Sequence, residues 1–288
     1  MDKRRFDSFI RKNLASEGHI SFGYELSKTY ENYDSRQSFA LFLDEMRTNY
    51  PEAFLAYDRG KGSELREQSG RYGKTPPKMA SVASSSRFCY LALRDGAASL
   101  GGGNVIFEHA CRIDGINGTA PQLDAFVPGY EIYVEAKCHE IFDAHRAVLK
   151  RKYWENIYGA NNAFGFPVCE APMCETFEIP LSAFGIHKRH TMFDIKQLLC
   201  HLMGIASRPD PKKSARLIYL FFKPKMDCPQ EREEIETVFE ELHREIGCIF
   251  RSDPIRSFTG ANKIHLEAVA EYAKTMKPLH KNNMIALF

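Results

Sequence analysis

The sequence lacks long apolar stretches and internal repeats. It has no run of about 18 apolar residues, the length that a membrane-spanning helix requires. The residues that follow Met1 lead into no apolar segment of the kind found in signal peptides. We therefore expect a globular, cytoplasmic protein that makes no membrane contact and is not a repeat array.

A large excess of one charge is also missing. The chain has 39 Lys and Arg against 37 Asp and Glu, which gives a formal net charge of +2. Binding to nucleic acid through overall charge is excluded, so any contact with phosphates must come from local basic patches. With 44% hydrophobic and 26% charged residues, the 288-residue chain has ordinary globular values and can bury a large core.

A disulfide framework is the third absence. The eight cysteines are scattered, and most lie inside predicted helices or strands, which favours buried free thiols in a reducing compartment. Cys169 and Cys174, taken with His187 and His190, do not have the spacing of a standard zinc module. The run Gly101-Gly102-Gly103 precedes a strand and opens no helix, so it predicts a flexible turn instead of a phosphate-binding loop.

Apolar periodicity divides the chain into two parts. The stretch 58–79 is rich in Gly, Lys, Arg and Pro, which predicts a boundary between an N-terminal helical extension with linker (1–80) and a main domain (81–288). The extension is expected to hold helices near 7–14 and 36–48. The main domain is expected to contain, in order, a helix at 84–94, strands at 105–113, 122–127 and 130–137, a helix at 194–205 and a strand at 215–222. A helix at 230–246, a strand at 248–250 and a helix at 265–276 follow. The fold class is α/β, with a mixed sheet flanked by helices.

A hairpin around Pro128-Gly129 places acidic and basic side chains together. Alternation along a strand puts Glu131, Tyr133, Glu135 and Lys137 on one face, and Ile132, Val134, Ala136 and Cys138 on the other. A two-residue turn pairs Val127 with Tyr130 and makes Asp124 and Glu135 diagonal neighbours, roughly 7–8 Å apart at the backbone. A four-residue turn sets the two directly opposite, whereas a three-residue turn without a bulge separates them onto opposite faces. A site shared by these carboxylates therefore requires an even turn or a bulge.

Asp124, Glu135 and Lys137 resemble the signature of the PD-(D/E)XK nuclease superfamily. The resemblance covers about half the chain, from Ser84 to Phe222, and includes the order αβββαβ of the restriction-endonuclease-like core; Leu123 stands where the superfamily's first proline would be. It implies a nuclease that hydrolyses DNA with Mg²⁺ or Mn²⁺, ions that prefer oxygen ligands. Asp124, Glu135 and the Ala136 carbonyl would be the metal ligands. Lys137 would orient or deprotonate the attacking water.

Four further side chains are candidates for the same site. Glu108 resembles the additional acidic residue of many superfamily members and is a candidate catalytic residue and metal ligand; the alternative is a solvent-facing strand residue. Gln197 resembles a glutamine that supports the site or contacts DNA in several nuclease families. Glu140 could lie beside the site, and His201, one turn after Gln197, is more typical of a structural residue.

A basic segment with the only tryptophan follows the proposed site. Arg146, Lys150, Arg151, Lys152 and Trp154 could contact DNA phosphates and stack on bases, or they could form a solvated helix face whose aromatic residues pack inward. The run 187–190 is a weaker basic candidate.

The function we expect is that of a DNA phosphodiester hydrolase in which a metal-activated water is the nucleophile. The main alternative is a non-catalytic nucleic-acid-binding or assembly protein with a nuclease-like fold. A small-molecule metallohydrolase is a third possibility, for which a closed apolar pocket over the site is expected. DNA strandedness, endo or exo mode, the role in restriction, repair or mobile elements, and a homodimeric state are all left open by the sequence.

Overall fold

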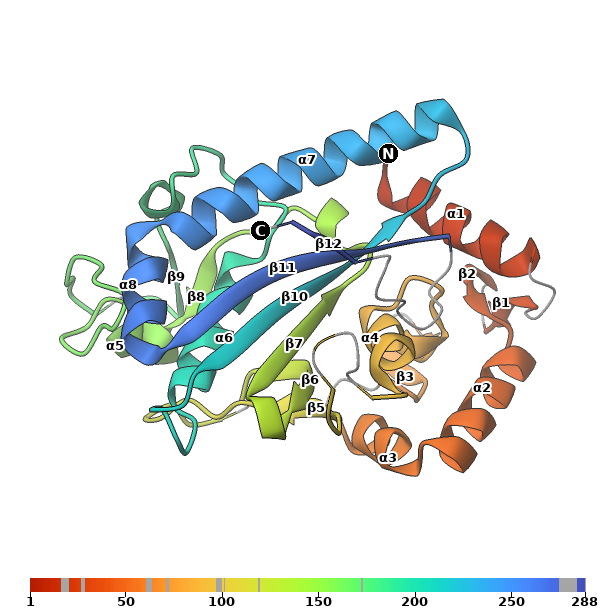
Figure 1. Ribbon diagram of the computed structural model, residues 1–288, viewed down its shortest axis with the longest axis horizontal. Helices are drawn as coiled ribbons and strands as arrows, with labels where there is room; N and C mark the ends of the chain where they lie inside the picture. Colours follow the sequence, from red (N-terminus) through yellow and green to blue (C-terminus); the bar gives the residue numbers. More distant parts are fainter. Residues whose placement is uncertain are drawn as a thin grey trace.

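A mixed six-stranded sheet lies at the centre of the molecule (Figure 1). The structure is a computed structural model that describes residues 1–16, 21–26, 29–60, 64–70, 73–96, 100, 102–118, 120–171, 173–274 and 284–287. The strand order is β12-β11-β10-β7-β6-β5. Strand β10 runs parallel to β7 and β11, whereas β5–β6, β6–β7 and β11–β12 pair antiparallel. The strands are β5 (Ile106–Ala110), β6 (Gln122–Val127), β7 (Ile132–Lys137), β10 (Ala215–Pro224), β11 (Ile264–Ala273) and β12 (Met284–Ala286).

Helices cover both faces of this sheet. Successive side chains of a strand point to opposite faces, and the aromatic residues of β10 show which helices lie on each. The Phe222 ring contacts Phe88 of α4 at 5.6 Å and Phe6 of α1 at 6.2 Å between centroids. Tyr219 points the other way, toward Phe250 of α7 and Phe193 just before α6. The helices concerned are α1 (Lys3–Ser16), α4 (Ser85–Leu93), α6 (Ile195–Ala206) and α7 (Pro229–Arg251); α8 (Asp253–Asn262) follows α7 and contacts β11.

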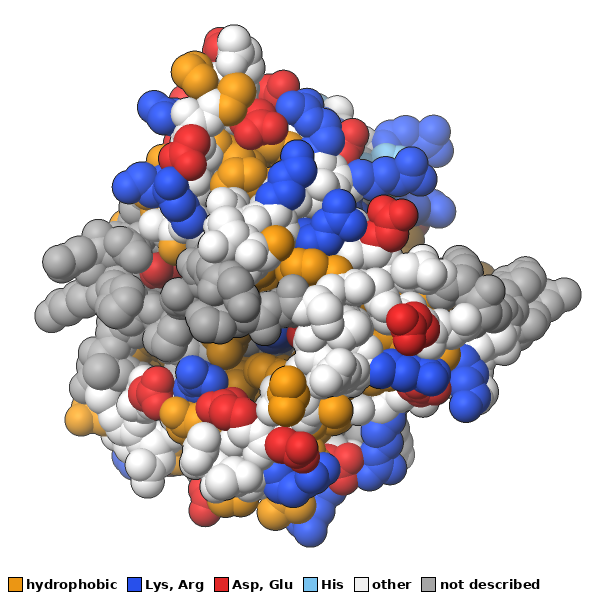
Figure 2. All heavy atoms as spheres, turned by 90° about the vertical axis from the view of Figure 1, so that its right-hand side faces the viewer, with side chains coloured by type: hydrophobic (Ala, Val, Ile, Leu, Met, Phe, Trp, Pro, Cys, Tyr) orange, Lys and Arg blue, Asp and Glu red, His pale blue; other side chains and the backbone are white. Residues whose placement is uncertain are grey.

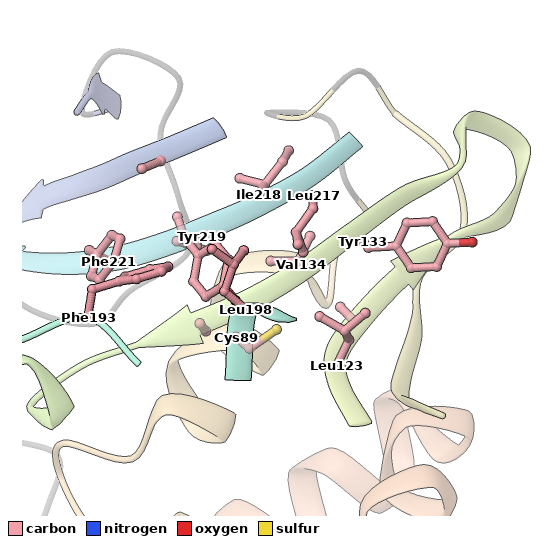
Figure 3. Close-up of a cluster of buried hydrophobic side chains, with 14 of the residues drawn as sticks. Cys89, Leu123, Tyr133, Val134, Phe193, Leu198, Leu217, Ile218, Tyr219 and Phe221 are labelled. Atoms are coloured by element: carbon pink, nitrogen blue, oxygen red, sulfur yellow. The ribbon is translucent and has the colours of Figure 1, made fainter. Parts of the chain in front are cut away.

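The apolar side chains between these layers form one core. Figure 3 shows the Phe193 ring beside Tyr219, with centroids 4.7 Å apart, while Leu123 and Val134 project from neighbouring strands. Tyr133 lies at the rim of this cluster with its hydroxyl turned away (Figure 3). The cluster buries Phe6 and Met46 as well as Leu123 and Ile218. The N-terminal region therefore shares its core with the main domain.

The N-terminal region is more than a helical extension. It contains α1, β1 (Phe22–Glu25), β2 (Thr29–Asp34), α2 (Arg36–Asn49), α3 (Pro51–Arg59), β3 (Gln68–Gly70), β4 (Gly73–Thr75) and the 3-10 turn η1 (Lys78–Ala80). Helix α3 packs beside the edge strand β5, and a buried ion pair joins Asp34 of β2 to Arg87 of α4 at 2.7 Å. This region lies on the right in Figure 1, and Figure 2 shows that face with acidic and basic side chains intermingled.

A long insertion separates β7 from α6. It consists of η4 (Glu140–Phe142), β8 (Val148–Lys150), η5 (Arg151–Tyr153), α5 (Trp154–Ile157), β9 (Thr176–Glu178) and η6 (Leu181–Phe184). Strands β8 and β9 form a separate antiparallel pair. The helix face considered for the basic segment from Arg146 to Trp154 is not formed over most of its length, which is instead strand β8 and turn η5, because the β8 backbone pairs with β9.

The sequence predicted the central elements well and the C-terminal ones less well. The helix, three strands, helix and strand expected between 84 and 222 are α4, β5, β6, β7, α6 and β10. The strand expected at 248–250 is wrong, because this short apolar run is the last turn of α7. The helix expected at 265–276 is also wrong over its described part, where the Ala- and Glu-rich sequence forms β11 through its long parallel pairing with β10. Residues 275 and 276 lie outside the described residues. Among those residues, no helix is long and apolar enough to cross a membrane.

Candidate active site

The turn between β6 and β7 sets the relation between the two carboxylates. Strand β6 ends at Val127, the 3-10 turn η3 (Pro128–Tyr130) follows, and Glu131 takes a left-handed conformation with φ 49° before β7 begins. The register pairs Val127 with Ile132 and Ala125 with Val134. Of the turn lengths that the sequence left open, the structure has the four-residue turn and not the two-residue one that would set Val127 opposite Tyr130. This even length places Asp124 opposite Glu135, as a shared site requires.

The two strands separate at the carboxylates. The β6–β7 ladder ends at the pair Ala125 and Val134, one position before Asp124 and Glu135. Where the ladder stops, the Ala136 N–H donates to the Asp124 carboxylate (Oδ2) at 2.8 Å, so a side chain replaces the missing backbone acceptor. The Asp124 side chain is thereby fixed in the opening between the strands, next to Glu135.

The side chains of Glu135, Lys137 and Gln197 form a ring in which each is hydrogen-bonded to the other two. The Lys137 ammonium donates to Glu135 Oε1 at 2.7 Å and to Gln197 Oε1 at 2.8 Å, and Gln197 Nε2 donates to Glu135 Oε1 at 2.7 Å. Glu135 and Lys137 come from β7, and Gln197 comes from α6. The ring gives the Lys137 ammonium two acceptors and Glu135 Oε1 two donors, although the Glu135 and Lys137 side chains are only 5% and 15% exposed. The structure thus brings Gln197 into direct hydrogen-bond contact with Glu135 and Lys137.

Two local features position helix α6 against the sheet: the cap at its first turn and the close packing of Gly204 against Cys111. The Asp194 carboxylate caps the helix by accepting from the Gln197 N–H at 3.0 Å. Further along, a Cβ on Gly204 would lie 2.6 Å from the Cys111 Cβ, so glycine is needed for α6 to pass so close to the end of β5. The cap defines where α6 begins, at the turn that holds Gln197, and the close approach at Gly204 sets the distance of the helix from the sheet.

His201 lies behind Glu135 as a neutral, buried residue. Its Nε2 is 3.2 Å from the Gln122 carbonyl and 3.7 Å from Glu135 Oε2, and its Nδ1 is 3.3 Å from the Tyr219 hydroxyl. Burial lowers the pKa of His201, although the Glu135 charge opposes this. The imidazole therefore supports Glu135 by contact and not as a second cation, which fits the structural role expected for it.

Negative charge exceeds positive charge around Asp124. Burial raises the pKa of Asp124 well above its ordinary value, and the facing Glu135 raises it further, while Lys137 and the Ala136 N–H act in the opposite direction. Burial by itself would lower the pKa of Lys137, but the charges of Glu135, Glu140 and Asp124 raise it overall. In the protein alone Lys137 is therefore a protonated ammonium, which can donate hydrogen bonds but cannot accept a proton.

The further acidic candidates lie on either side of this cluster. Glu140 accepts from the Cys138 N–H at 2.7 Å; burial would raise its pKa, but Lys137 and a hydrogen bond from Ser85 of α4 lower it overall. Glu108, on β5, falls opposite Asp124 in the register of β5 and β6, but its φ of 53° turns it out of the regular strand. Its carboxylate lies close to Gly60. Burial and the nearby Glu64 raise the pKa of Glu108 to about 7.

The basic segment divides between two hollows. Lys150 and Lys152 line a hollow of about 510 Å³ that also borders Gln197 and His201. Arg146 faces a different hollow of about 740 Å³, lined also by the basic run 187–190, and is ion-paired with Glu178. The Arg151 side chain is exposed, whereas Trp154 is partly buried against the core. Of the five candidates for nucleic-acid contact, only the two lysines line a hollow whose wall includes Gln197 and His201, the neighbours of Glu135.

The oxygen atoms near Asp124 and Glu135 are suitable ligands for a hard divalent cation, but they are too few to fill its coordination sphere. Asp124, Glu135 and the Ala136 carbonyl supply oxygen atoms only, and the buried carboxylates are incompletely neutralised by Lys137. In the described part of the chain, no group of three or more His, Cys, Asp or Glu is placed to hold a metal ion. A cation at this position would therefore need water or substrate oxygens as additional ligands. Cys169 and Cys174 are exposed and free, as are Cys228 and Cys248, so only half of the cysteines are the buried thiols expected.

Three residues of this region were not predicted as site residues. Asp194 caps α6, and the pattern Asp-x-x-Gln from Asp194 to Gln197 is a recognisable start of a helix. Tyr219 pairs with Glu135 across β7 and β10, a relation that only the parallel register reveals. Lys196 precedes Gln197 and lines the same hollow as Lys150.

Comparison of the chain with protein-family models, with curated proteins and with solved structures found no match.

Proposed function

We propose that the protein is a metal-dependent deoxyribonuclease of the PD-(D/E)XK type, with a restriction-endonuclease-like core formed by α4, β5, β6, β7, α6 and β10. The observation that carries the proposal is the placement of Asp124 opposite Glu135 at the point where β6 and β7 separate, with the Lys137 ammonium bonded to Glu135. Two carboxylates and one ammonium in this arrangement supply the groups that metal-assisted hydrolysis of a phosphodiester needs.

Each residue has a defined task in this proposal. Asp124, Glu135 and the Ala136 carbonyl would hold Mg²⁺ or Mn²⁺, which when bound supplies charge for the phosphate and lowers the pKa of water. Lys137 presents N–H donors that can hold a water or a phosphate oxygen in a fixed direction. Gln197 holds the Lys137 ammonium and the Glu135 carboxylate in a fixed relative orientation, because its amide group hydrogen-bonds to both. Glu108 and Glu140 adjust the local charge from either side.

The experiment that tests the proposal is a cleavage assay with matched variants. Supercoiled plasmid, linear duplex and single-stranded DNA are incubated with the protein and Mg²⁺ or Mn²⁺, with EDTA as the blank. We expect cleavage that needs the metal and disappears in Asp124→Asn and Lys137→Gln. Glu131→Gln serves as the control, because Glu131 is an acidic residue of the same hairpin that hydrogen-bonds to Tyr133 away from the cluster. Cleavage that survives both site variants unchanged, with their circular dichroism intact, would refute the proposal.

A non-catalytic nucleic-acid-binding protein of the same fold is the second candidate. It is favoured by the small number of metal-ligating side chains in the described part of the chain and by the internal neutralisation of Glu135 by Lys137. It predicts salt-sensitive DNA binding with no metal-dependent cleavage of any of the three DNA forms. The same assay, combined with a binding measurement, separates the two functions.

A further inference from the structure

We infer that the hollow beside Gln197 receives one unpaired DNA strand, with its phosphates on Lys150, Lys152 and Lys196 and a base against Tyr153. This inference rests on the proposed function and names the form of DNA that the site takes. The hollow has a volume of about 510 Å³, within the range of ligand sites of nucleotide size, and it is lined by side chains from β8, η5 and α6.

The hollow adjoins the proposed catalytic cluster directly. Gln197 and His201 are part of its wall, and both contact Glu135, at 2.7 Å and 3.7 Å respectively. A phosphate held at this wall is therefore separated from the Glu135 carboxylate by the side chain of Gln197 or His201. No comparable link to Glu135 exists for the larger hollow near Arg146, whose lining residues include none of those that touch Glu135.

The three lysines are available to a ligand. All three are exposed, and within the described ranges none of them lies within 4.0 Å of a carboxylate. The cations of the neighbouring hollow differ in this respect, because Arg146 and Lys188 are ion-paired with Glu178 and Glu241. Asp194 is the one carboxylate that lines the hollow, and it is engaged in capping α6 and lies 3.7 Å from His145. The surface around the hollow therefore carries a local excess of positive charge, although the net charge of the whole protein is close to zero.

Tyr153 connects the hollow to a second one, so that the proposed binding surface for the DNA strand is longer than one nucleotide. Its ring lines the hollow and also a second one of about 330 Å³, which contains Arg112 and shares Ala120 and Pro121 with the first. The ring is half-buried and already has the Lys152 ammonium 4.9 Å from its centroid. An aromatic ring beside ammonium groups is the arrangement that binds single strands, because it stacks on a base while the cations hold the backbone. Bases of a duplex are stacked internally and cannot reach a ring recessed in a hollow.

Binding measured without metal tests this inference independently of cleavage. A fluorescein-labelled 12-nucleotide DNA and its duplex are titrated with the full chain in EDTA and followed by anisotropy. We expect the single strand to bind at least tenfold more tightly than the duplex. The triple variant Lys150→Gln/Lys152→Gln/Lys196→Gln should reduce the slope of log K against log salt by about 2, since each single-strand phosphate contact contributes about 0.7.

Matched variants distinguish binding at the hollow from a general effect of lysine charge on DNA binding. Lys12→Gln/Lys213→Gln/Lys225→Gln removes the same charge from exposed lysines that line neither hollow, and it should leave the salt slope unchanged. Tyr153→Ala should weaken single-strand binding by about tenfold, whereas Tyr153→Phe should retain it.

The possible results distinguish this inference from the nuclease proposal. Equal binding of single strand and duplex, or equal effects of the two triple variants, would overturn the inference even if the protein cleaves DNA. Lysine-dependent single-strand binding without metal-dependent cleavage would support the inference and refute the nuclease function.

Discussion

The Asp124 carboxylate accepts the Ala136 N–H at 2.8 Å, across the gap where β6 and β7 stop pairing. The bond joins a side chain on one strand to the backbone next to Glu135 on the other. It holds two like-charged groups near each other, which costs free energy in the isolated protein. A site that maintains such a cost is typical of a functional arrangement, because stability is often reduced where charges are arranged for chemistry.

Asp124→Asn should abolish most activity and raise stability. The amide oxygen can still accept the Ala136 N–H, but the buried negative charge facing Glu135 is removed. We expect metal-dependent cleavage to fall by about 10²-fold or more, and the free energy of unfolding in metal-free buffer at pH 7 to rise by about 1 kcal/mol. Thermal denaturation with EDTA measures the second effect, and a drop in stability would contradict the proposed charge balance.

Gln197→Ala should lower the turnover number with little effect on the KM for DNA. The alanine leaves Lys137 and Glu135 bonded to each other but removes the amide that fixes their orientation. Loss of an orienting partner of this kind reduces activity by about 10- to 100-fold. Gln37→Ala, on the exposed face of α2, is the control. A rise in KM alone would show that Gln197 contacts DNA and does not position the ring.

The stability of the metal-free protein should fall as the pH rises through the titration of Glu108. An unfolded glutamate ionises near pH 4.5, whereas Glu108 in the folded protein keeps its proton up to about pH 7. Between these values the folded state binds more protons, so the free energy of unfolding decreases with pH, by about 3 kcal/mol at most. Glu108→Gln should flatten this part of the pH profile and stabilise the protein at pH 8. Urea denaturation in EDTA from pH 4 to 8 measures the difference, and identical profiles would show that Glu108 is solvated.

The buried pair of Asp34 and Arg87 should be sensitive to the loss of one partner. Both side chains are nearly inaccessible, at 1% and 7% exposure, so removing one leaves the other charged and unpaired. We expect Asp34→Ala to cost about 3–5 kcal/mol, and the double variant Asp34→Ala/Arg87→Met to recover part of that loss. The exposed pair Asp44 and Arg47 is the control, for which Asp44→Ala should cost less than about 0.5 kcal/mol. Equal costs at the two pairs in a denaturant titration would contradict this difference.

The sequence left the length of the turn between β6 and β7 open, and it required an even turn or a bulge for Asp124 and Glu135 to share a site. Alternation along β7 and the need for an even turn follow from strand geometry alone. The Pro128-Gly129 signal indicated a turn without fixing its length, because Glu131, a residue with no special preference for it, adopts the left-handed conformation that closes a four-residue turn. Local sequence signals indicate that a turn is present more reliably than they indicate its length.

Contacts between distant elements explain the remaining differences. The apolar spacing of α6 predicted which of its faces is buried, but not that Gln197 would bridge Glu135 and Lys137, a relation set by how the helix packs on the sheet. Glu108 could not be placed because its side-chain direction depends on one backbone angle. Lys150 and Lys196 meet at one hollow only because β8 pairs with β9 in an insertion whose fold the sequence did not reveal.

The position of Phe6 between Phe142 and Phe222 has a consequence for the order in which the chain acquires its structure. The last of these rings is added to the growing polypeptide 216 residues after the first. At ribosomal rates of 5–20 residues per second, helix α1 waits roughly 10–40 s for its docking surface. During synthesis helix α1, although it is made before the other described helices, therefore docks late, and it is exposed to chaperones and proteases until β10 is in place.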